Sequence, residues 1–285
     1  MDTHVVVTSG GSVEVRYVPA EKPPVLLFPG GHTTAATPIG EHIYTQLGHG
    51  VLCFSRPGYG RTEVGPLTAA EFTTLIDETC QALEVAHPAA AVGISLGGLQ
   101  AIHTAISTPE LAPKLILHSC APSALPYPDT WLERVAGPLA FGSATQKWTW
   151  AFIRRAVARD AGLKIMMKSL SRAPEAQWWS KMSETDRESA RALFNAMESG
   201  YGFINDVRQA GSRLNGYRAH IQTLVAAPTL ITASRHDGGV SFRHAENLAK
   251  TIPHADLYET DAATHLYWIG DAQTDITQAI RRFLA

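Results

Sequence analysis

Short apolar runs alternate with helix-length segments along most of this chain, and this alternation restricts its fold more than any other feature. Runs that are apolar at every residue are typical of strands buried on both faces of a parallel sheet. The expected strands are residues 4–8, 12–18, 24–28, 51–54, 90–92, 115–117, 228–232 and 256–259. The first two form a hairpin, and the helical segments between the others indicate a doubly wound, mostly parallel eight-stranded α/β sheet with helices on both faces.

The alternation stops near residue 121 and resumes near residue 218. The stretch between is helical in pattern and holds five of the six tryptophans and four of the five methionines. In the flanking parts we expect helices at about 67–86, 96–107, 241–251 and 272–284, the first with Thr68 as its N-cap. The sequence therefore predicts one α/β core, residues 1–121 and 218–285, interrupted by a helical cap (a lid), residues 122–217.

Composition excludes several classes of protein. The formal net charge is −2 and Lys and Arg form no cluster, so we expect no nucleic-acid partner. Cys53, Cys80 and Cys120 form neither a zinc spacing nor a disulfide framework, and all three are interpreted mainly as core residues. The first residues do not resemble a signal peptide and no window is long enough for a membrane span, so we expect a cytoplasmic protein.

The strongest chemical signal is the string Gly93-Ile94-Ser95-Leu96-Gly97. The string alone is weak evidence, because a Gly-rich turn from strand to helix would look the same. Its context matters more: an expected strand precedes it and an expected helix follows it, as a nucleophile elbow requires. Ser95 would then lie at a helix N-terminus, where the helix dipole favours developing negative charge.

An acid and a base follow two later strands. Asp237 comes after the strand at 228–232, and His265 comes after the strand at 256–259. Because the carboxyl ends of parallel strands meet at one edge of a sheet, we expect both side chains to lie near Ser95. Their order in the chain fits a Ser-Asp-His catalytic triad, although an Asp before Gly and a His in a loop are each ordinary turn residues.

A second Gly-rich loop, residues 28–33, directly follows an early strand. Acyl transfer needs two donors for the oxyanion, and we expect the backbone N–H groups of Gly31 and Leu96 to supply them. The other interpretation is a tight turn whose glycines only relieve backbone strain. His32 in this loop and Trp131 in the cap are candidates for lining the substrate site.

With these motifs in hand, the chain resembles the α/β-hydrolase superfamily, in its lid-bearing serine esterase and lactonase-like branch. The resemblance covers about residues 20–121 and 218–285. Residues 55–62, Ser-Arg-Pro-Gly-Tyr-Gly-Arg-Thr, are similar to the family's D-x-R-G-x-G-x-S loop. The resemblance implies the α/β-hydrolase fold, with Asp237 and His265 at the positions of the family's acid and base.

The chain also departs from the family pattern. Pro29-Gly30 replaces the usual His-Gly, Ser55 replaces the usual Asp, and Thr264 replaces the Gly before the catalytic His. The serine at position 95 sets aside the branches that resemble this one but use Asp, namely dehalogenases and epoxide hydrolases. It also sets aside the Cys-dependent dienelactone-hydrolase-like members.

The sequence therefore predicts hydrolysis of a small, largely apolar ester or lactone through an acyl-enzyme, by a monomer or homodimer. No cofactor is expected, and no metal, because the histidines show no metal-ligand spacing. Three alternatives stay open. A C–C bond hydrolase would use cap cations from among Arg154, Arg155 and Arg191. A hydroxynitrile lyase-like enzyme would use a lysine, with Lys164, Lys168 and Lys181 as candidates, and a ligand receptor or slow hydrolase would bind more than it turns over.

Overall fold

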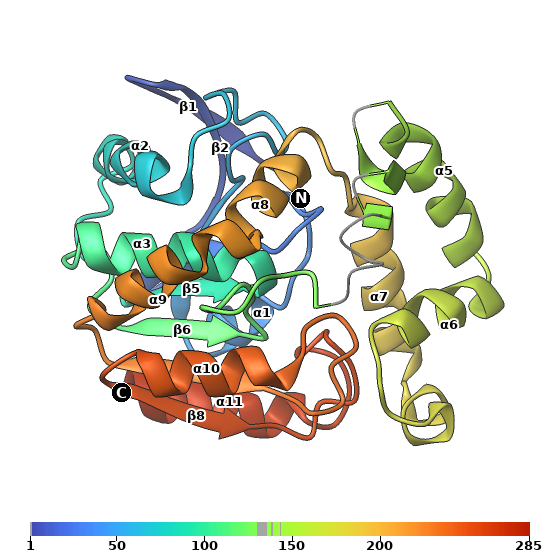
Figure 1. Ribbon diagram of the computed structural model, residues 1–285. Helices are drawn as coiled ribbons and strands as arrows, with labels where there is room; N and C mark the ends of the chain where they lie inside the picture. The colour runs from blue at the N-terminus through green and yellow to red at the C-terminus, as the bar shows by residue number, and fades with distance from the viewer. Residues whose placement is uncertain (1, 130–135, 138, 143) are drawn as a thin grey trace.

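Eight strands form a single sheet in the computed structural model, which describes residues 2–129, 136–137, 139–142 and 144–285 (Figure 1). The strands are β1 His4–Thr8, β2 Gly11–Val18, β3 Lys22–Phe28, β4 His49–Phe54, β5 Ala90–Ile94, β6 Leu115–His118, β7 Thr229–Ala233 and β8 Ala255–Glu259. Their spatial order is β1-β2-β4-β3-β5-β6-β7-β8. The pairings β1–β2 and β2–β4 are antiparallel and all others are parallel, which confirms the expected mostly parallel eight-stranded sheet.

The central strands are apolar throughout because both of their faces are covered. In β3, Leu26 and Phe28 belong to one hydrophobic cluster, and Val25 and Leu27 belong to the cluster on the opposite face. All four side chains are fully buried. Alternate residues of a strand point to opposite faces, so a strand with helices on each side needs apolar residues at every position.

Helices cover both faces of the sheet. The helices of the core are α1 His42–Gln46, α2 Ala69–Ala82, α3 Gly98–Ser107, α9 Asn215–Thr223, α10 Phe242–Thr251 and α11 Gln273–Leu284. Buried residues of α2, α3, α9 and α10 belong to one cluster, and those of α1 and α11 to the other. Helix α2, the first of the helices expected from the sequence, begins as predicted, because Thr68 caps it and Glu71 completes a capping box.

The segment between β6 and β7 is helical, as its sequence predicts. Its further helices are α5 Gln146–Val157, α6 Asp160–Ser169, α7 Glu184–Ala196 and α8 Gly202–Ala210. Figure 1 shows α5, α6 and α7 beyond the carboxyl ends of the parallel strands, whereas α8 lies over the core beside α3. The exact division into a core and a cap of residues 122–217 stays a proposal; below, "cap" means α5 to α7 and their connections.

Candidate active site

Ser95 lies at the tip of a sharp turn between a strand and a helix. Strand β5 ends at Ile94, and a short 3-10 helix, Ser95–Gly97, leads directly into α3. The backbone of Ser95 has a φ of 52°, in the left-handed region that is costly for a residue with a Cβ. Strain of this kind is typical of functional positions, and the turn places the hydroxyl at the N-terminus of α3.

The glycines around this turn allow backbone segments to approach closely. A Cβ on Gly97 would lie 2.1 Å from the carbonyl oxygen of Phe28, and one on Gly93 would lie 2.6 Å from the Cα of Gly98. A Cβ on Gly98 would in turn lie 2.6 Å from the Sγ of Cys120. This thiol is buried and donates to the carbonyl of Gly93 at 3.2 Å, so Cys120 fills the core behind the turn.

Asp237 and His265 meet at the same edge of the sheet. The His265 Nδ1 lies 2.8 Å from the Asp237 Oδ2, while the other carboxylate oxygen accepts from the backbone N–H groups of Gly239 at 2.7 Å and Val240 at 2.9 Å. Asp237 is only 2% exposed, so these three contacts fix its side chain. Gly239 also leaves room for the imidazole, because a Cβ there would lie 3.0 Å from the ring.

The charge of Asp237 controls the protonation of His265. Burial by itself lowers the pKa of the imidazole, but the charge of Asp237 and its hydrogen bond to Nδ1 outweigh burial. The net result is a pKa above the usual value of 6.5. Because Nδ1 is held by the carboxylate, Nε2 is the ring nitrogen left to exchange a proton with a substrate or nucleophile.

The Gly-rich loop of residues 28–33 packs against the turn that carries Ser95. A Cβ on Gly30 would lie 3.0 Å from the Cβ of Ser95, and one on Gly31 would lie 2.7 Å from the Cδ1 of Leu96. Gly31 and Leu96, the two residues predicted to donate to an oxyanion, are therefore neighbours. Gly30, Gly31 and Ser95 also line one cavity.

A buried ion pair that the sequence did not reveal anchors this loop. Arg56 donates to the carbonyls of Pro29 at 2.8 Å and Gly30 at 2.9 Å. Its guanidinium also donates to both carboxylate oxygens of Asp206 in α8, at 2.5 and 2.8 Å, and the Tyr59 hydroxyl donates to the same carboxylate at 2.7 Å. Burial lowers the pKa of Arg56, but the charge of Asp206 outweighs it and raises that pKa.

Ser55 replaces the family's usual Asp at the start of the Arg56 loop, and Glu14 of β2 supplies a carboxylate at that place. The Ser55 hydroxyl donates to the Glu14 Oε2 at 2.7 Å and accepts from the backbone N–H of Ala35 at 2.8 Å. The backbone N–H of Arg61 donates to the same carboxylate at 3.1 Å. A residue distant in sequence thus places a carboxylate beside Ser55.

The cap is bonded directly to the loops that carry the acid and the base. The carbonyl of Leu170, just after α6, accepts from the backbone N–H groups of both Gly238 at 3.0 Å and His265 at 2.8 Å. Ser171 pairs with Asp237 in an isolated antiparallel bridge, and its hydroxyl donates to the carbonyl of Ala263 at 2.5 Å. The cap therefore holds these two loops in position as well as covering them.

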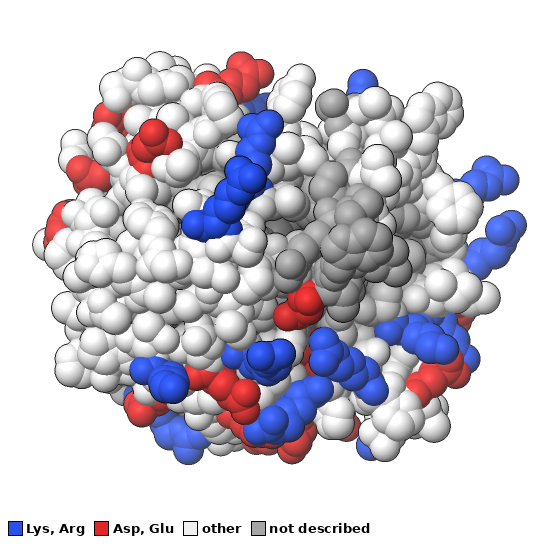
Figure 2. All heavy atoms as spheres, in the orientation of Figure 1, with Lys and Arg blue, Asp and Glu red and all other residues white. Residues whose placement is uncertain are grey.

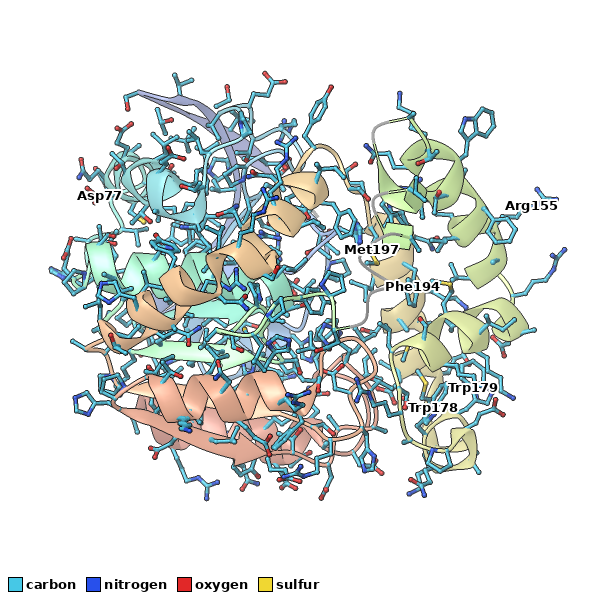
Figure 3. All side chains as sticks on the ribbon, viewed as in Figure 1. Asp77, Arg155, Trp178, Trp179, Phe194 and Met197 are labelled. Atoms are coloured by element: carbon cyan, nitrogen blue, oxygen red, sulfur yellow. The ribbon has the colours of Figure 1, made fainter. Side chains whose placement is uncertain are left out.

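A cavity of about 220 Å³ joins the Ser95 turn, His265 and the cap. The cap and the residues on either side of it contribute apolar side chains to its wall: Phe141, Trp150, Ile153, Met166, Leu193, Phe194 and Met197. Figure 3 shows Phe194 and Met197 on the side of the cap that faces the core. The cavity can therefore bury an apolar group next to Ser95.

His32, predicted to line the substrate site, does line this cavity. Its Nδ1 lies 2.8 Å from the Ser199 Oγ, and its ring packs against Phe203 and Phe141 with centroids 4.2 and 4.5 Å apart. Burial and the positive charge of Arg56 lower the pKa of His32 to about 3, so its ring is neutral. Trp131, the other residue predicted to line the site, lies outside the described residues.

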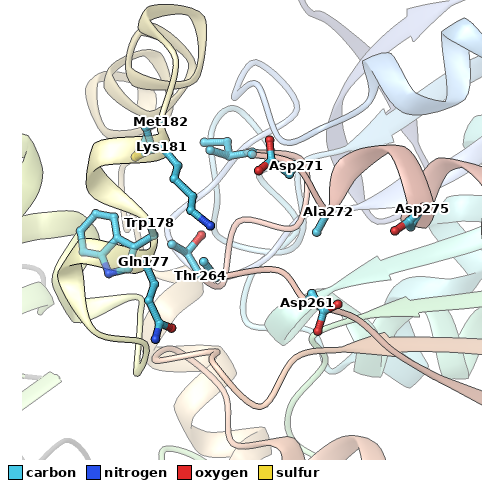
Figure 4. Close-up of a pocket in the computed structure, with 12 residues that line it drawn as sticks. Gln177, Trp178, Lys181, Met182, Asp261, Thr264, Asp271, Ala272 and Asp275 are labelled. Carbon is cyan, nitrogen blue, oxygen red and sulfur yellow. The ribbon is translucent and has the colours of Figure 1, made fainter.

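None of the six cap cations considered for other reactions lines this cavity among the described residues. Arg154 donates to the carbonyls of Asn195 and Met197, and Lys164 pairs with Glu175 at 2.5 Å. Lys181 lines a separate cavity of about 280 Å³ between the cap and the segment that leads into α11 (Figure 4). That cavity adjoins the His265 loop through Thr264, and Ser95 is not part of its lining.

The comparisons with known proteins agree with the observed fold. Residues 23–270 match the family described as "alpha/beta hydrolase fold". An "Uncharacterized hydrolase YcgS" of Bacillus subtilis (strain 168) is 30% identical in an alignment that covers 96% of this chain and 95% of that protein. The chain belongs to the α/β-hydrolase fold family.

Two solved structures support the assignment of the fold. An α/β hydrolase fold protein from Nakamurella multipartita has a TM-score of 0.76 at 21% identity, with 99% of each chain covered. An enol-lactonase from Burkholderia xenovorans LB400 has a TM-score of 0.72 at 18% identity, also with 99% of each chain covered. At such identities the likeness concerns the fold alone.

This α/β hydrolase shows two further features in the part of the chain that the structure describes. No group of three or more His, Cys, Asp or Glu side chains there is arranged to hold a metal ion. No described helix combines the length and the apolar character needed to cross a bilayer.

Proposed function

We propose that this hydrolase cleaves a carboxylic ester or lactone through an acyl-enzyme formed on Ser95. The observation that carries the proposal is the His265–Asp237 hydrogen bond of 2.8 Å, beside a cavity that also contains the strained Ser95. A serine nucleophile needs a base and a carboxylate that orients the base, and here His265 lines the same cavity as Ser95 while Asp237 holds its ring.

In the proposed reaction, Ser95 Oγ attacks the carbonyl carbon while the Nε2 of His265 takes its proton. Asp237 holds the imidazole through Nδ1 and stabilises the imidazolium that forms. The backbone N–H groups of Leu96 and Gly31 donate to the oxyanion of the tetrahedral intermediate. His265 then protonates the leaving alcohol, and a water molecule, deprotonated by the same residue, hydrolyses the acyl-enzyme.

The apolar wall of the cavity supports the proposal that the enzyme recognises a largely apolar acyl or alcohol group of the substrate. Trp150, Ile153 and Met166 line it from the cap, and the neutral ring of His32 adds no charge. We propose a cytoplasmic enzyme that acts on small molecules, not on nucleic acid.

The two enzymatic alternatives find less support. A C–C bond hydrolase would need a cation near the substrate's carboxylate, and a hydroxynitrile lyase would need a lysine near Ser95. Among the described residues, the lining of the Ser95 cavity includes no Lys or Arg. A ligand receptor would need no fixed base, whereas Asp237 holds His265.

Turnover of a panel of p-nitrophenyl esters and lactones tests the proposal. The wild-type protein should hydrolyse members of the panel with apolar acyl groups, and Ser95→Ala should lower kcat by at least about 10⁴-fold with its fold intact. Substantial turnover by Ser95→Ala would refute the nucleophile. No turnover by the wild-type protein above the Ser95→Ala level would refute ester hydrolysis, and a product burst without steady turnover would favour the receptor.

A further inference from the structure

One face of the cap, on the side of α5 opposite the active-site cavity, exposes large apolar side chains among basic ones. We define this outer cap face by Lys147, Trp148, Phe152, Arg155 and Arg159, in α5 and the residues that follow it. Trp148 is 81% exposed and Phe152 is 74% exposed. A monomeric protein rarely leaves neighbouring aromatic side chains uncovered without a binding role.

The exposed residues form a stripe along α5. Trp148 and Phe152 are one helical turn apart, and Arg155 follows within the next turn, so the three share a face. The buried residues Trp150 and Ile153 lie on the opposite face and line the active-site cavity. Helix α5 is therefore amphipathic in an unusual way, with apolar residues both toward the cavity and outward.

The charge around this stripe is strongly positive although the whole chain is slightly negative. Residues 146–159 contain four Lys and Arg and no Asp or Glu, while the chain carries a formal net charge of −2. Asp160 pairs with Arg187 and Arg191 of α7, so it does not neutralise the stripe. Among the described residues, no carboxylate lies within 4 Å of Lys147, Arg155 or Arg159.

The figures show how these side chains are presented. In Figure 3 the labelled Arg155 projects from α5 away from the core. In Figure 2 basic side chains project at the edge of the molecule over α5, and the acidic ones that are visible lie lower on the cap and on the core. Helix α5 lies at the outer edge of the molecule in this view (Figure 1).

We propose that the outer cap face docks on an anionic lipid surface. Trp and Phe enter the interface between headgroups and acyl chains, while Lys and Arg beside them bind anionic headgroups. A second copy of the chain is a poorer occupant, because two such faces would bring like charges together. A single-stranded nucleic acid is poorer as well, because it binds along a positively charged groove, whereas these residues follow a single helix at the outer edge of the molecule.

Docking in this orientation would have a consequence for the reaction, which rests on the proposed function. The helix that lies on the lipid is the one whose other side lines the active-site cavity through Trp150 and Ile153. Docking would therefore place the cap, and not the far side of the sheet, next to the lipid surface. Docking itself requires no hydrolysis and is testable without it.

Flotation of the purified full-length protein with lipid vesicles tests the proposal. One set is made of phosphatidylcholine and the other of phosphatidylcholine with about 30 mol% phosphatidylglycerol, at about 0.05 M and about 0.5 M NaCl. We expect at least about tenfold stronger partition to the anionic vesicles at low salt, and loss of that preference at high salt. Absence of partition to anionic vesicles at low salt would overturn the proposal.

Two groups of variants separate the apolar and the electrostatic contributions. Lys147→Gln/Arg155→Gln/Arg159→Gln should weaken binding to anionic vesicles by about 100-fold, since each cation near such a surface contributes about fivefold. Trp148→Ala/Phe152→Ala should weaken it by about tenfold or more. Unchanged partition of either variant would refute a role for this face.

Matched controls lie elsewhere on the molecule. Val7→Ala removes an apolar side chain that is 83% exposed on β1, and Arg281→Gln/Arg282→Gln removes two exposed cations of α11. Both should bind vesicles like the wild-type protein, and a loss equal to that of the outer cap face variants would refute the assignment. All variants should keep the wild-type Tm, a fold check that does not depend on the proposed reaction.

Solution measurements address the other occupants directly. Sedimentation velocity of the wild type and of Trp148→Ala/Phe152→Ala reports whether this face joins two copies. The proposal would be contradicted if the wild type formed a dimer that the double variant does not form. It would also be contradicted if the protein bound a single-stranded oligonucleotide tightly and did not bind vesicles.

Discussion

Removal of Asp206 should destabilise the protein strongly, because Arg56 would remain as an unpaired charge in the core. Arg56 is 5% exposed and Asp206 is 7% exposed. Asp206→Ala removes the acceptor of two guanidinium hydrogen bonds and of the Tyr59 hydroxyl bond, 2.5 to 2.8 Å long. Breaking a buried pair by removing one partner typically costs about 3–5 kcal/mol of unfolding free energy, and we expect a loss in that range.

Urea unfolding of the wild type and Asp206→Ala measures this loss through the transition midpoints and m-values. Glu175→Ala is a matched control, because it breaks a 2.5 Å ion pair with Lys164 whose side chains are 35% and 44% exposed. An exposed pair contributes about 1 kcal/mol or less, so the control should differ little from the wild type. A loss below about 1 kcal/mol for Asp206→Ala would refute the reasoning.

The same variant should also lower the rate of hydrolysis. Arg56 anchors the carbonyls of Pro29 and Gly30, next to the proposed oxyanion donor Gly31. A donor that contacts only the transition state affects kcat more than KM, so Asp206→Ala should lower kcat by at least about tenfold with KM changed by less than about threefold. An increase in KM alone would indicate that the ion pair shapes substrate binding instead.

Three further predictions concern residues around Ser95. Ser171→Ala removes the hydroxyl that bonds the cap to the His265 loop, and in a steady-state assay it should lower kcat by about threefold to tenfold with KM unchanged. The control Ser180→Ala, on the exposed side of the cap, should have no effect in the same assay. Gly97→Ala should prevent accumulation of active protein, because its Cβ would lie 2.1 Å from a carbonyl oxygen. The control Gly216→Ala should stay active, because a Cβ at this position meets nothing within 4 Å. Asp237→Asn should lower kcat about 10⁴-fold and move the acid limb of the pH profile of kcat/KM to lower pH. The reason is that activity needs the neutral imidazole of His265, and Asp237 raises the pKa of that imidazole above 6.5, so a limb that does not move would contradict this.

The sequence was most informative where burial dictates residue type. Leu26, Val92 and Ile116 lie in strands covered on both faces, so their runs are apolar throughout and easy to recognise. Helix α1 is not predicted from the sequence, because its five residues, His42–Gln46, are too few to show a helical period and no side chain caps its N-terminus.

The residues proposed for catalysis were found because each follows a strand. The contacts that support them left no comparable signal. Arg56 and Asp206 are 150 positions apart, and nothing in either local sequence predicts the pair. The bonds from Gly238 and His265 to the carbonyl of Leu170 are made by backbone groups, which every residue type carries.

Labelling with a fluorophosphonate, mapped to a residue by mass spectrometry, tests the central claim most directly. This probe reacts with a serine that an adjacent base activates. The account predicts a single adduct on Ser95 in the wild-type protein and almost none in His265→Ala, whose serine lacks its base. An adduct on another residue, or none in a preparation that hydrolyses esters, would contradict the assignment of Ser95 as the nucleophile.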